Sequence, residues 1–550
     1  MTVRAYSAAT AEPASRRRWA GLFFIALGVA MIIVDATIVN VAVPQIIKDL
    51  GITSSDAQWV QEVYTLVFAA LLLVWGRLSD RYGRRLLFVT GAAGFAAASV
   101  LAAFARSGPE LIGSRVLQGI AGAMMLPTSL SLLNAGFRGR DRAIAFAVWG
   151  STIGGTAALG PLLGGWLTTS YSWRWAFGIN IPLGLAVVAG TVLLVPESRE
   201  ATAARGNDLA GAVLSVLGFG GVVFGLIEGR NYGWWTRTGQ VSVAGLGWSW
   251  PVSPVPVAFA VGIGFLLAFV AVERRRNAAG RVVLLDLGLF SIPSFRNGNI
   301  AAAIVSLGEF GLLFALPLWF ENVRGYSAFE TGIALLPLAI GSFAASGFGA
   351  QLASRKGPVF VVRLGIALEL VGVAGIGAVV GPGTAWWATV PVLVVYGLGV
   401  GLATAQLTGV VLADVPVANS GQGSGTQSTS RQIGSVFGIA ILGTVLFTTL
   451  GVQLSHKLAA LPAGQRAAIV TAVKQSAGAA ITHLAADPRT AQVAAIAKDA
   501  FSQATRLTAF CAAAFLALGL LASLSLGRAS TAGQPPQIPE PGPRAAEPTA

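Results

Sequence analysis

The stretch Gly76-Arg-Leu-Ser-Asp-Arg-Tyr-Gly83 decides the fold, because a weaker copy of it, Ala350-Gln-Leu-Ala-Ser-Arg-Lys-Gly357, occurs later in the chain. The two copies are about 274 residues apart. At the same offset Asp35 falls on Glu309, and both acids lie inside apolar runs. Many transporter folds consist of repeated sets of helices. The shared offset therefore predicts two equivalent halves.

Apolar runs of about 20 residues surround both copies and recur from Trp19 to Leu526. Hydrophobic residues make up 54% of the chain and charged residues 11%, against about 45–50% and 25% in soluble domains. A helix of about 20 residues crosses a hydrocarbon core of about 30 Å. Barrel strands are shorter and alternate polar with apolar residues. The sequence thus predicts an all-α membrane protein.

We expect fourteen membrane-spanning helices and two six-helix bundles, at 19–195 and 297–526, with two inserted helices at 208–272 between them. The expected spans are 19–43, 57–75, 86–105, 109–135, 143–168, 174–195, 208–228, 254–272, 297–320, 331–352, 358–380, 386–413, 424–450 and 504–526.

The basic residues indicate the orientation of these spans. Loops on one side carry clusters of arginine and lysine at 77–85, 138–142, 199–205, 274–296 and 355–356, whereas the other short loops carry only isolated ones. Clusters of this kind mark the cytoplasmic side. We therefore expect a multi-pass protein of the cell inner (plasma) membrane with both termini in the cytoplasm.

Three segments lie outside the expected spans. Residues 1–18 form an N-terminal tail, and the Pro- and Gly-rich residues 527–550 have too little apolar surface to fold. The loop at about 451–503 falls outside the cell, and its alanine-rich stretches have helical periodicity. We interpret this loop as an amphipathic hairpin on the outer face; a substrate lid or a partner site is the alternative.

The formal charge of +14 does not indicate nucleic-acid binding, because the basic residues are not gathered in one patch. Cys511, the single cysteine, can form neither a disulfide framework nor a thiol metal site. A nucleotide-binding loop, a metal-ligand cluster and a Ser/His/Asp set are all missing from the sequence. We therefore expect no enzyme activity, no cofactor, no metal and no ATP hydrolysis.

Four motifs carry a resemblance to a known family. They are Asp35-Ala-Thr-Ile-Val-Asn-Val-Ala-Val-Pro44, Gly76 to Arg85, Arg115-Val-Leu-Gln-Gly-Ile-Ala-Gly122, and Gly150 with Gly160-Pro-Leu-Leu-Gly-Gly165. The chain resembles, over nearly its whole length, the fourteen-helix drug:proton antiporter branch of the major facilitator superfamily. The resemblance implies a monomeric exporter that moves small lipophilic molecules by alternating access, driven by protons.

We interpret the loop motif as a conformational latch, a contact that holds the two halves together on the cytoplasmic side in one state and breaks in the other. Its residues are Gly76, Asp80, Arg81, Gly83 and Arg84. The glycines allow a tight turn and close helix approach. The Asp80 carboxylate can pair with arginines or with the positive N-terminus of a neighbouring helix. A plain positive loop is the alternative, although it would not require this order of residues.

Small residues dominate the span at 143–168. Four glycines of this span permit close packing against another helix: Gly150, Gly160, Gly164 and Gly165. Pro161 removes a backbone hydrogen bond and allows a bend. The resemblance implies that this antiporter motif limits proton leakage, whereas glycine spacing alone implies only packing.

Ionisable side chains inside hydrocarbon are costly, so each is a functional candidate. Counts of about 1.5 Å per residue from the outer helix ends place Asp35 about 13 Å deep and Glu62 and Arg115 about 9 Å deep, so these three could meet in the outer half of the first bundle. The same count places Glu309 and Glu369 near the midplane. Arg431 also lies inside a span. We predict proton coupling at Asp35, Arg115, Glu309 and Glu369, with Asp35 as the main proton-carrying acid; the alternative for each acid is a structural ion pair.

The substrate cavity is predicted from several buried acids and from aromatic side chains, which together suit a lipophilic cation. Its residues are Glu62, Trp59, Tyr64, Phe310 and Phe314. Abundant alanine and glycine with few lysines are typical of high-GC bacteria, where a pump for a secreted antibiotic is plausible. A proton-coupled importer of a small metabolite remains open, as does a non-transporting membrane receptor or enzyme.

Overall fold

The computed structural model describes residues 11–52, 54–156, 159–199, 208–237, 241–243 and 246–527. The described chain is mainly helical. The α-helices are α1 (Ala11–Leu50), α2 (Ser54–Tyr82), α3 (Arg84–Ala103), α4 (Gly108–Gly136), α5 (Gly139–Thr156), α6 (Leu159–Ser170), α7 (Trp175–Gly178), α8 (Asn180–Leu194), α9 (Leu209–Tyr232), α10 (Pro254–Ala278), α11 (Pro293–Asn322), α12 (Ala328–Lys356), α13 (Pro358–Val379), α14 (Trp386–Val411), α15 (Ser420–Lys457), α16 (Ala463–Gln475), α17 (Ala480–Ala486) and α18 (Ala491–Ser523).

Short elements complete the described chain. The strands β1 (Val241–Val243) and β2 (Leu246–Trp248) form an antiparallel hairpin between α9 and α10. Two 3₁₀ helices, η1 (Leu287–Ser291) and η2 (Val417–Asn419), precede α11 and α15.

Twelve described helices are long and apolar enough to cross a membrane, and thirteen if the bent helix α12 counts as one span. The all-α membrane class is thereby confirmed. The span expected at 143–168 is divided into α5 and α6, which flank residues 157 and 158 outside the described part of the chain. The total of fourteen spans therefore stays a prediction.

Several helices begin at serine caps that the local sequence supplies. The hydroxyl groups of Ser107, Ser253 and Ser327 accept backbone N–H groups in the first turns of α4, α10 and α12. Such caps satisfy donors that otherwise have no intrahelical partner. At Ser327 the Glu330 carboxylate completes a capping box.

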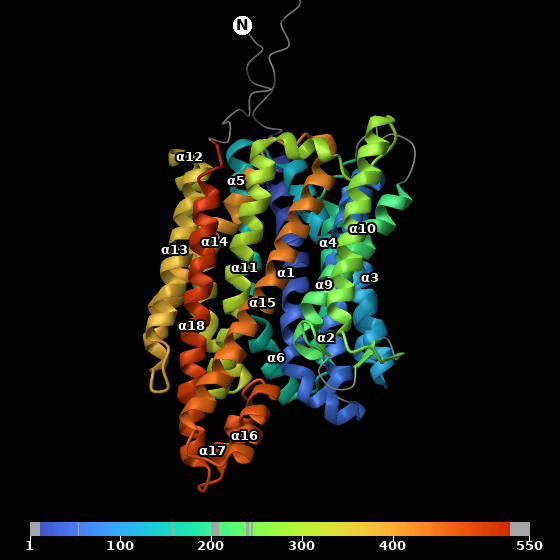
Figure 1. Cartoon of the computed structure of the whole chain (residues 1–550). Coiled ribbons are helices and arrows are strands. Elements are labelled where there is room, and N and C mark those ends of the chain that lie inside the picture. The colour runs from blue at the N-terminus through green and yellow to red at the C-terminus, as the bar shows by residue number, and fades with distance from the viewer. Residues whose placement is uncertain are drawn as a thin grey trace, which may run out of the picture.

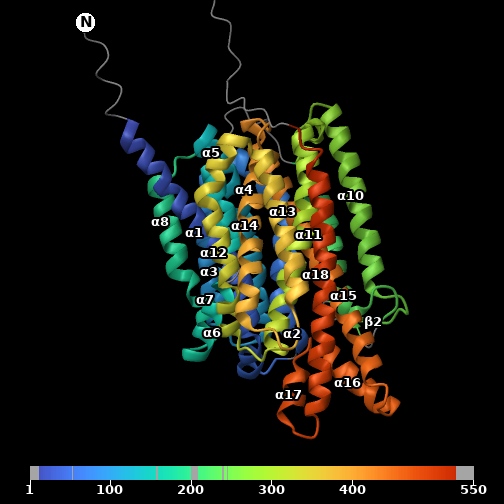
Figure 2. The same ribbon diagram turned by 90° about the vertical axis from the view of Figure 1, so that its left-hand side faces the viewer.

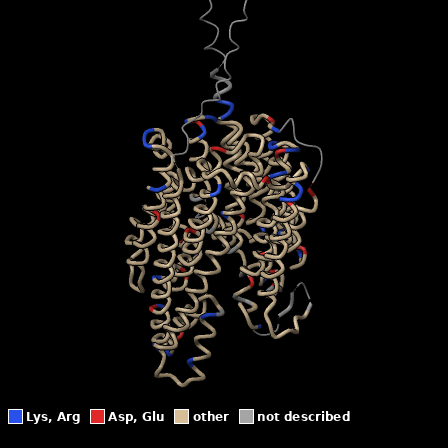
Figure 3. The backbone as a smooth tube through the Cα atoms, turned by 45° about the horizontal axis from the view of Figure 1, so that its top comes forward, with Lys and Arg blue, Asp and Glu red and all other residues tan. Residues whose placement is uncertain are grey.

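The helices form two bundles with an inserted pair beside them (Figures 1 and 2). Helices α1 to α8 form the first bundle, and α11 to α15 with α18 form the second. The inserted helices α9 and α10 pack on each other, and α9 packs along α2. We call the end of the molecule where α1 begins and α18 ends the terminal end, and the opposite end the far end. Charged residues gather at the terminal end (Figure 3).

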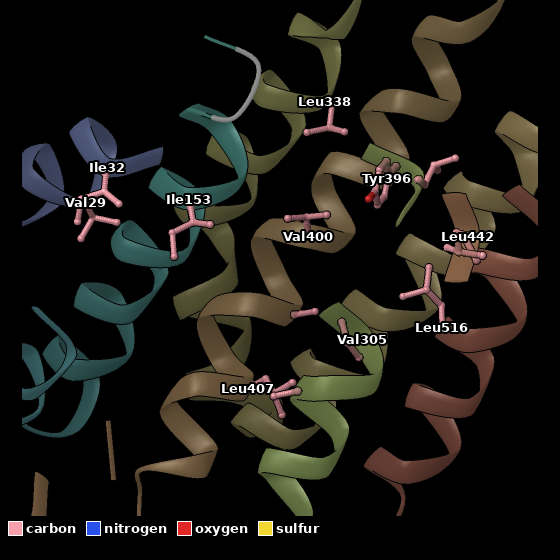
Figure 4. Packing of buried hydrophobic residues seen from close by; sticks show 14 of the residues in the cluster. Val29, Ile32, Ile153, Val305, Leu338, Tyr396, Val400, Leu407, Leu442 and Leu516 are labelled. Atoms are coloured by element: carbon pink, nitrogen blue, oxygen red, sulfur yellow. The ribbon is translucent and has the colours of Figure 1, made fainter. Parts of the chain in front are cut away.

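The bundles meet along two helix seams: α2 and α4 pack on α15, while α5 packs on α12 and α14 and α6 packs on α12. One large cluster of buried apolar side chains includes residues of both bundles. In Figure 4, Val29, Ile32 and Ile153 come from the first bundle, and Tyr396 and Val400 from the second.

The segment at 451–503 differs from the expected loop. Helix α15 continues to Lys457, and α18 begins at Ala491, well before the expected start of the last span. Between them α16 and α17 project at the far end (Figure 1). The expected helical character is present. The predicted boundaries were too short because hydropathy marks where a helix leaves the apolar core and not where the helix ends.

Candidate functional site

In the first bundle Asp35 of α1 lies at the centre of a fully buried polar cluster. Its Oδ2 is 2.5 Å from Nη1 of Arg115 on α4. Its Oδ1 accepts hydrogen bonds from the side-chain amides of Gln118, at 3.2 Å, and Asn180, at 2.7 Å. All four side chains are at most 1% exposed. These three donors stabilise Asp35 as an anion.

Arg115 is itself held in place by several neighbours. Its Nε donates to the carbonyl oxygen of Val60 at 3.0 Å, and Nη1 donates to Oε1 of Gln118 at 2.8 Å. The guanidinium lies 4.3 Å from the ring centroid of Tyr64 and 5.8 Å from that of Phe177. The charge of Arg115 is therefore fixed against Asp35 by helices α2 and α4.

The second bundle holds a different cluster of buried charges. Arg431 of α15 lies 3.5 Å from Oε2 of Glu309 on α11. Glu369 of α13 interacts electrostatically with both, yet neither of its carboxylate oxygens has a hydrogen-bond partner within the described chain. Tyr396 donates to the backbone carbonyl of Glu309 at 3.1 Å. One arginine thus faces two buried acids, and it can neutralise only one of them.

The latch residues join the two bundles at the terminal end. The Asp80 carboxylate accepts the backbone N–H groups of Gly421, at 2.7 and 2.9 Å, and Gln422, at 3.1 Å, in the first turn of α15. Arg84 pairs with Asp80 at 2.8 Å and donates to the carbonyl of Val417 at 2.7 Å. Both kinds of partner expected for Asp80, an arginine and a helix N-terminus, are present.

The other latch residues surround this contact. A Cβ atom on Gly76 would lie 2.5 Å from the carbonyl oxygen of Gly421, so only glycine fits there. Gly83 has a φ of 119° and faces the carboxylate of Glu197. Glu197 in turn accepts the N–H groups of Arg85 and Leu86 at the start of α3. Arg81 lies beside the ring of Tyr82.

Hydroxyl and amide side chains extend the contact between the bundles at this end. Asn134 donates to Ser420 at 2.8 Å, and Ser131 donates to Ser424 at 3.1 Å. These bonds connect α4 with α15. The terminal end is therefore closed by direct contact between the halves.

The glycines of α5 and α6 contact other helices closely. A Cβ atom on Gly150 would lie 2.7 Å from the backbone nitrogen of Ala405 in α14, and one on Gly165 would lie 3.0 Å from that of Phe329. The neighbour of Gly160 is Thr37 of α1. Gly164 is buried and its carbonyl accepts the hydroxyl of Thr168. Pro161 lies in the first turn of α6.

A family model described as "Major Facilitator Superfamily" matches residues 25–439, which include both buried-charge clusters and the latch. The chain belongs to the major facilitator superfamily.

Curated members of the superfamily resemble the chain along most of their length. It is 35% identical to the "Probable actinorhodin transporter" of Streptomyces coelicolor, covering 81% of this chain and 75% of the relative. It is 34% identical to the "Multidrug efflux pump LfrA" of Mycolicibacterium smegmatis, covering 78% and 81%. It is 31% identical to the "Tetracenomycin C resistance and export protein" of Streptomyces glaucescens, covering 79% and 77%.

Among solved structures, the crystal structure of the human organic anion transporter MFSD10 matches the structure of this chain with a TM-score of 0.56. The match covers 92% of this chain and 99% of that one, at 13% sequence identity. This likeness supports the fold alone.

Glu62 does not join the Asp35 and Arg115 pair, contrary to the depth argument. Together with Trp59 it faces α9, next to Phe224 and Glu228. Val60 and Tyr64 of α2 face Arg115 on α4. Glu62 lies two positions from each of them, and residues two positions apart point to different sides of a helix. Counting along the helix does not give the direction of a side chain around it, which is why Glu62 was assigned to the wrong neighbours.

The other predicted cavity residues are dispersed. Tyr64 is buried beneath Arg115, while Phe310 and Phe314 are half-buried and one turn apart on α11. A cavity of about 250 Å³ lies elsewhere, between the far ends of α9 and α10, where Trp234, Trp235, Pro256 and Phe259 line it. The structure does not gather the predicted residues into one cavity.

Sequence reasoning missed Gln118 and Asn180 as partners of Asp35. Gln118 lies inside the motif that begins at Arg115, one helical turn further along, so its spacing offered a signal. Asn180 gave none, because it approaches from α8, distant in sequence. Glu197 was missed as well, since it lies in a polar loop.

Proposed function

We propose that this major facilitator protein exports small lipophilic molecules, such as antibiotics or toxic cations, across the cell membrane in exchange for protons. Export is supported by the relatives, two of which are named for multidrug efflux or for antibiotic resistance and export. Proton exchange is supported by the fully buried pair of Asp35 and Arg115. A carboxylate inside a membrane is costly and marks an ion pathway.

The pair provides a simple way to exchange a proton. With Arg115 and two amides against it, Asp35 is stabilised as an anion. If a conformational change moves Arg115 away, the desolvated carboxylate binds a proton more readily. Return of Arg115 releases that proton. Because Arg115 is anchored to α2 at Val60, a shift of α2 relative to α1 would change the contact.

The latch would couple this exchange to alternating access. We infer that the terminal end is cytoplasmic, since the arginine clusters lie there. Asp80 holds α2 to α15 at that end, so the described conformation is closed toward the cytoplasm. Separation of Asp80 from Gly421 would open the cytoplasmic side. One chain contains both halves of the latch, which supports action as a monomer.

The cluster in the second bundle would provide a further coupling site. Arg431 neutralises Glu309, and Glu369 remains without a hydrogen-bond partner among the described residues. Burial of a lone carboxylate favours its protonated form. We therefore assign an exchangeable proton to Glu369, while Glu309 and the nearby Phe310 contribute to substrate binding.

The direction of transport separates this proposal from its main alternative, a proton-coupled importer. Everted membrane vesicles that contain the protein should accumulate a fluorescent lipophilic cation when the vesicle lumen is acidified, because protons that leave the lumen drive the cation in. Vesicles with Asp35→Asn protein serve as the control. Accumulation only in right-side-out vesicles would favour import, and absence of transport with every compound of a broad drug panel would favour a receptor or enzyme.

A further inference from the structure

Two acids meet at the terminal end of the inserted helices, outside every site described above. Asp208 caps α9, and its Oδ1 accepts the N–H of Gly211 at 2.8 Å. Glu273 near the end of α10 is fully buried. A Cβ atom on Gly211 would lie 2.3 Å from Oε1 of Glu273 and 2.7 Å from Oδ2 of Asp208. The two carboxyl groups therefore converge over one glycine, within hydrogen-bonding reach of each other.

Within the described residues, one arginine forms an ion pair with these acids, and its partner is Asp208. Nε of Arg276 lies 3.2 Å from Oδ2 of Asp208. Oε1 of Glu273 is buried and has no hydrogen-bond partner in the described chain, although it lies with Oδ2 of Asp208 over Gly211. A carboxylate only accepts hydrogen bonds, so two of them can bond to each other only when one carries a proton. Two buried anions at this separation would repel strongly.

Arg274 and Arg275 follow Glu273 on α10 and are exposed, and further charged groups lie on the neighbouring elements. The carboxylate of Asp286 accepts the N–H of Gly288 and so caps η1. On α2, which packs along α9, the charged side chains at this end are Arg77, Asp80 and Arg81, and Asp80 pairs with Arg84 at the start of α3. The side chain of α15 that reaches toward the inserted helices is the neutral Gln422.

Three consecutive backbone amides, which we call the strap (residues 284–286), connect the acids to the latch. Leu284 donates to Asp208 at 3.3 Å, and Leu285 donates to Oε2 of Glu273 at 3.4 Å. Asp286 donates to Oε1 of Gln422 at 2.7 Å. The backbone nitrogen of Gln422 donates in turn to Asp80. The strap thus ties the inserted helices to the residue that holds the two halves together.

We propose that Asp208 and Glu273 bind one proton between them and that this proton keeps the strap attached to the inserted helices. Loss of the proton would leave two adjacent buried anions, and Glu273 would move toward water and release Leu285. Through Gln422, release of the strap would weaken the terminal-end contact of Asp80. This inference deepens the proposed function, on which the role of the latch rests, by adding regulation of the latch by pH at the terminal end.

Hydrogen exchange of the whole protein in lipid nanodiscs tests the proton site without any substrate. After correction for the intrinsic pH dependence of exchange, the amides of the strap should exchange several-fold faster as the pH rises through the neutral range. Glu273→Gln, which resembles the protonated acid, should abolish that dependence. Asp286→Asn keeps the same backbone donor and should retain it. Exchange that responds to pH equally in Glu273→Gln, or in no variant, would overturn the proposal.

Two further measurements separate the parts of the proposal. Infrared spectroscopy should show a protonated carboxyl band that disappears in Glu273→Gln, and a spectrum unchanged by this substitution would refute the shared proton. Gln422→Ala should leave the pH response of the strap intact but remove that of residues 417–425. A response at 417–425 that survives in Gln422→Ala would refute the link to the latch. Neither result depends on whether the protein exports a drug.

Discussion

Asp35 and Glu369 are both fully buried, yet their neighbours favour opposite charge states. Asp35 receives an ion pair and two amide hydrogen bonds, which compensate for the loss of water around an anion. Glu369 receives no hydrogen bond from the described residues and shares Arg431 with Glu309. In the proposed mechanism, a change in these contacts lets the first acid bind a proton and the second acid lose one.

Replacement of Asp35 by asparagine should abolish coupled efflux, and Arg115→Ala should move the pH optimum of efflux upward. Removal of Arg115 leaves the ionised form of Asp35 without its buried counter-charge, which costs about 3–5 kcal/mol. The acid should therefore retain its proton at ordinary pH and release it only at higher pH. The measurement is drug-induced proton release from purified protein as a function of pH.

A matched control for this prediction exists on the same helix. Asp49 also pairs with an arginine, Arg174, but at the exposed far end of α1. The guanidinium of Arg174 and the indole of Trp173 hold the pKa of Asp49 below its ordinary value. Asp49→Asn should leave proton release unchanged. Full proton release by Asp35→Asn would move the coupling role to Glu309 or Glu369.

The two acids of the second bundle should respond differently to amide substitution. Glu369→Gln fixes a neutral side chain and should reduce the number of protons released per drug bound. Glu309→Gln removes the partner of Arg431 and should change the range of compounds that are exported more than the coupling. Parallel drug-susceptibility panels and proton-release assays distinguish these effects; identical profiles for both variants would contradict the separation of roles.

Among the helices, α2 and α15 are joined by a charge at a helix end. Asp80→Asn keeps the shape of the side chain but removes the ion pair with Arg84 and the attraction to the α15 N-terminus, worth up to about 2 kcal/mol. Gly83 has a positive φ, so Gly83→Val adds backbone strain of about 1–3 kcal/mol. The valine side chain also displaces the carboxylate of Glu197. Both variants should insert normally but export several-fold more slowly, as vesicle transport normalised to protein amount would show. Normal transport by both would mean that the motif serves only as a topology signal.

The sequence allowed the membrane helices and the contact of Asp80 to be predicted, because each follows from local patterns. Hydropathy marks apolar spans, and Asp80 needs only a nearby positive helix end. Depth counting also brought Asp35 to Arg115 correctly. It misplaced Glu62, since the direction of a side chain around α2 depends on which helix packs against it. Asn180 and the Asp208 and Glu273 pair were out of reach because tertiary packing alone brings them to their partners.

For the molecule as a whole, transport should depend on the proton gradient and not on ATP. An uncoupler added at constant ATP should stop efflux from intact cells, because a single major facilitator chain without a nucleotide-binding loop has no other source of energy in this proposal. Cells that express Asp35→Asn protein give the baseline. Continued extrusion against a concentration gradient after the proton gradient has been dissipated would refute proton coupling.

The glycine contacts between the halves have a mechanical consequence. Gly76 meets α15 backbone to backbone on one seam, and Gly150 meets Ala405 of α14 in the same way on the other. Surfaces without side chains have nothing to interlock, so they can roll on each other while the separation of the helix axes stays constant. In the proposed mechanism the Gly76 contact separates together with the bond between Asp80 and Gly421, and the Gly150 contact serves as the pivot between the halves. A methyl group at either point would lengthen the spacing and stiffen the rotation before it affected any charge.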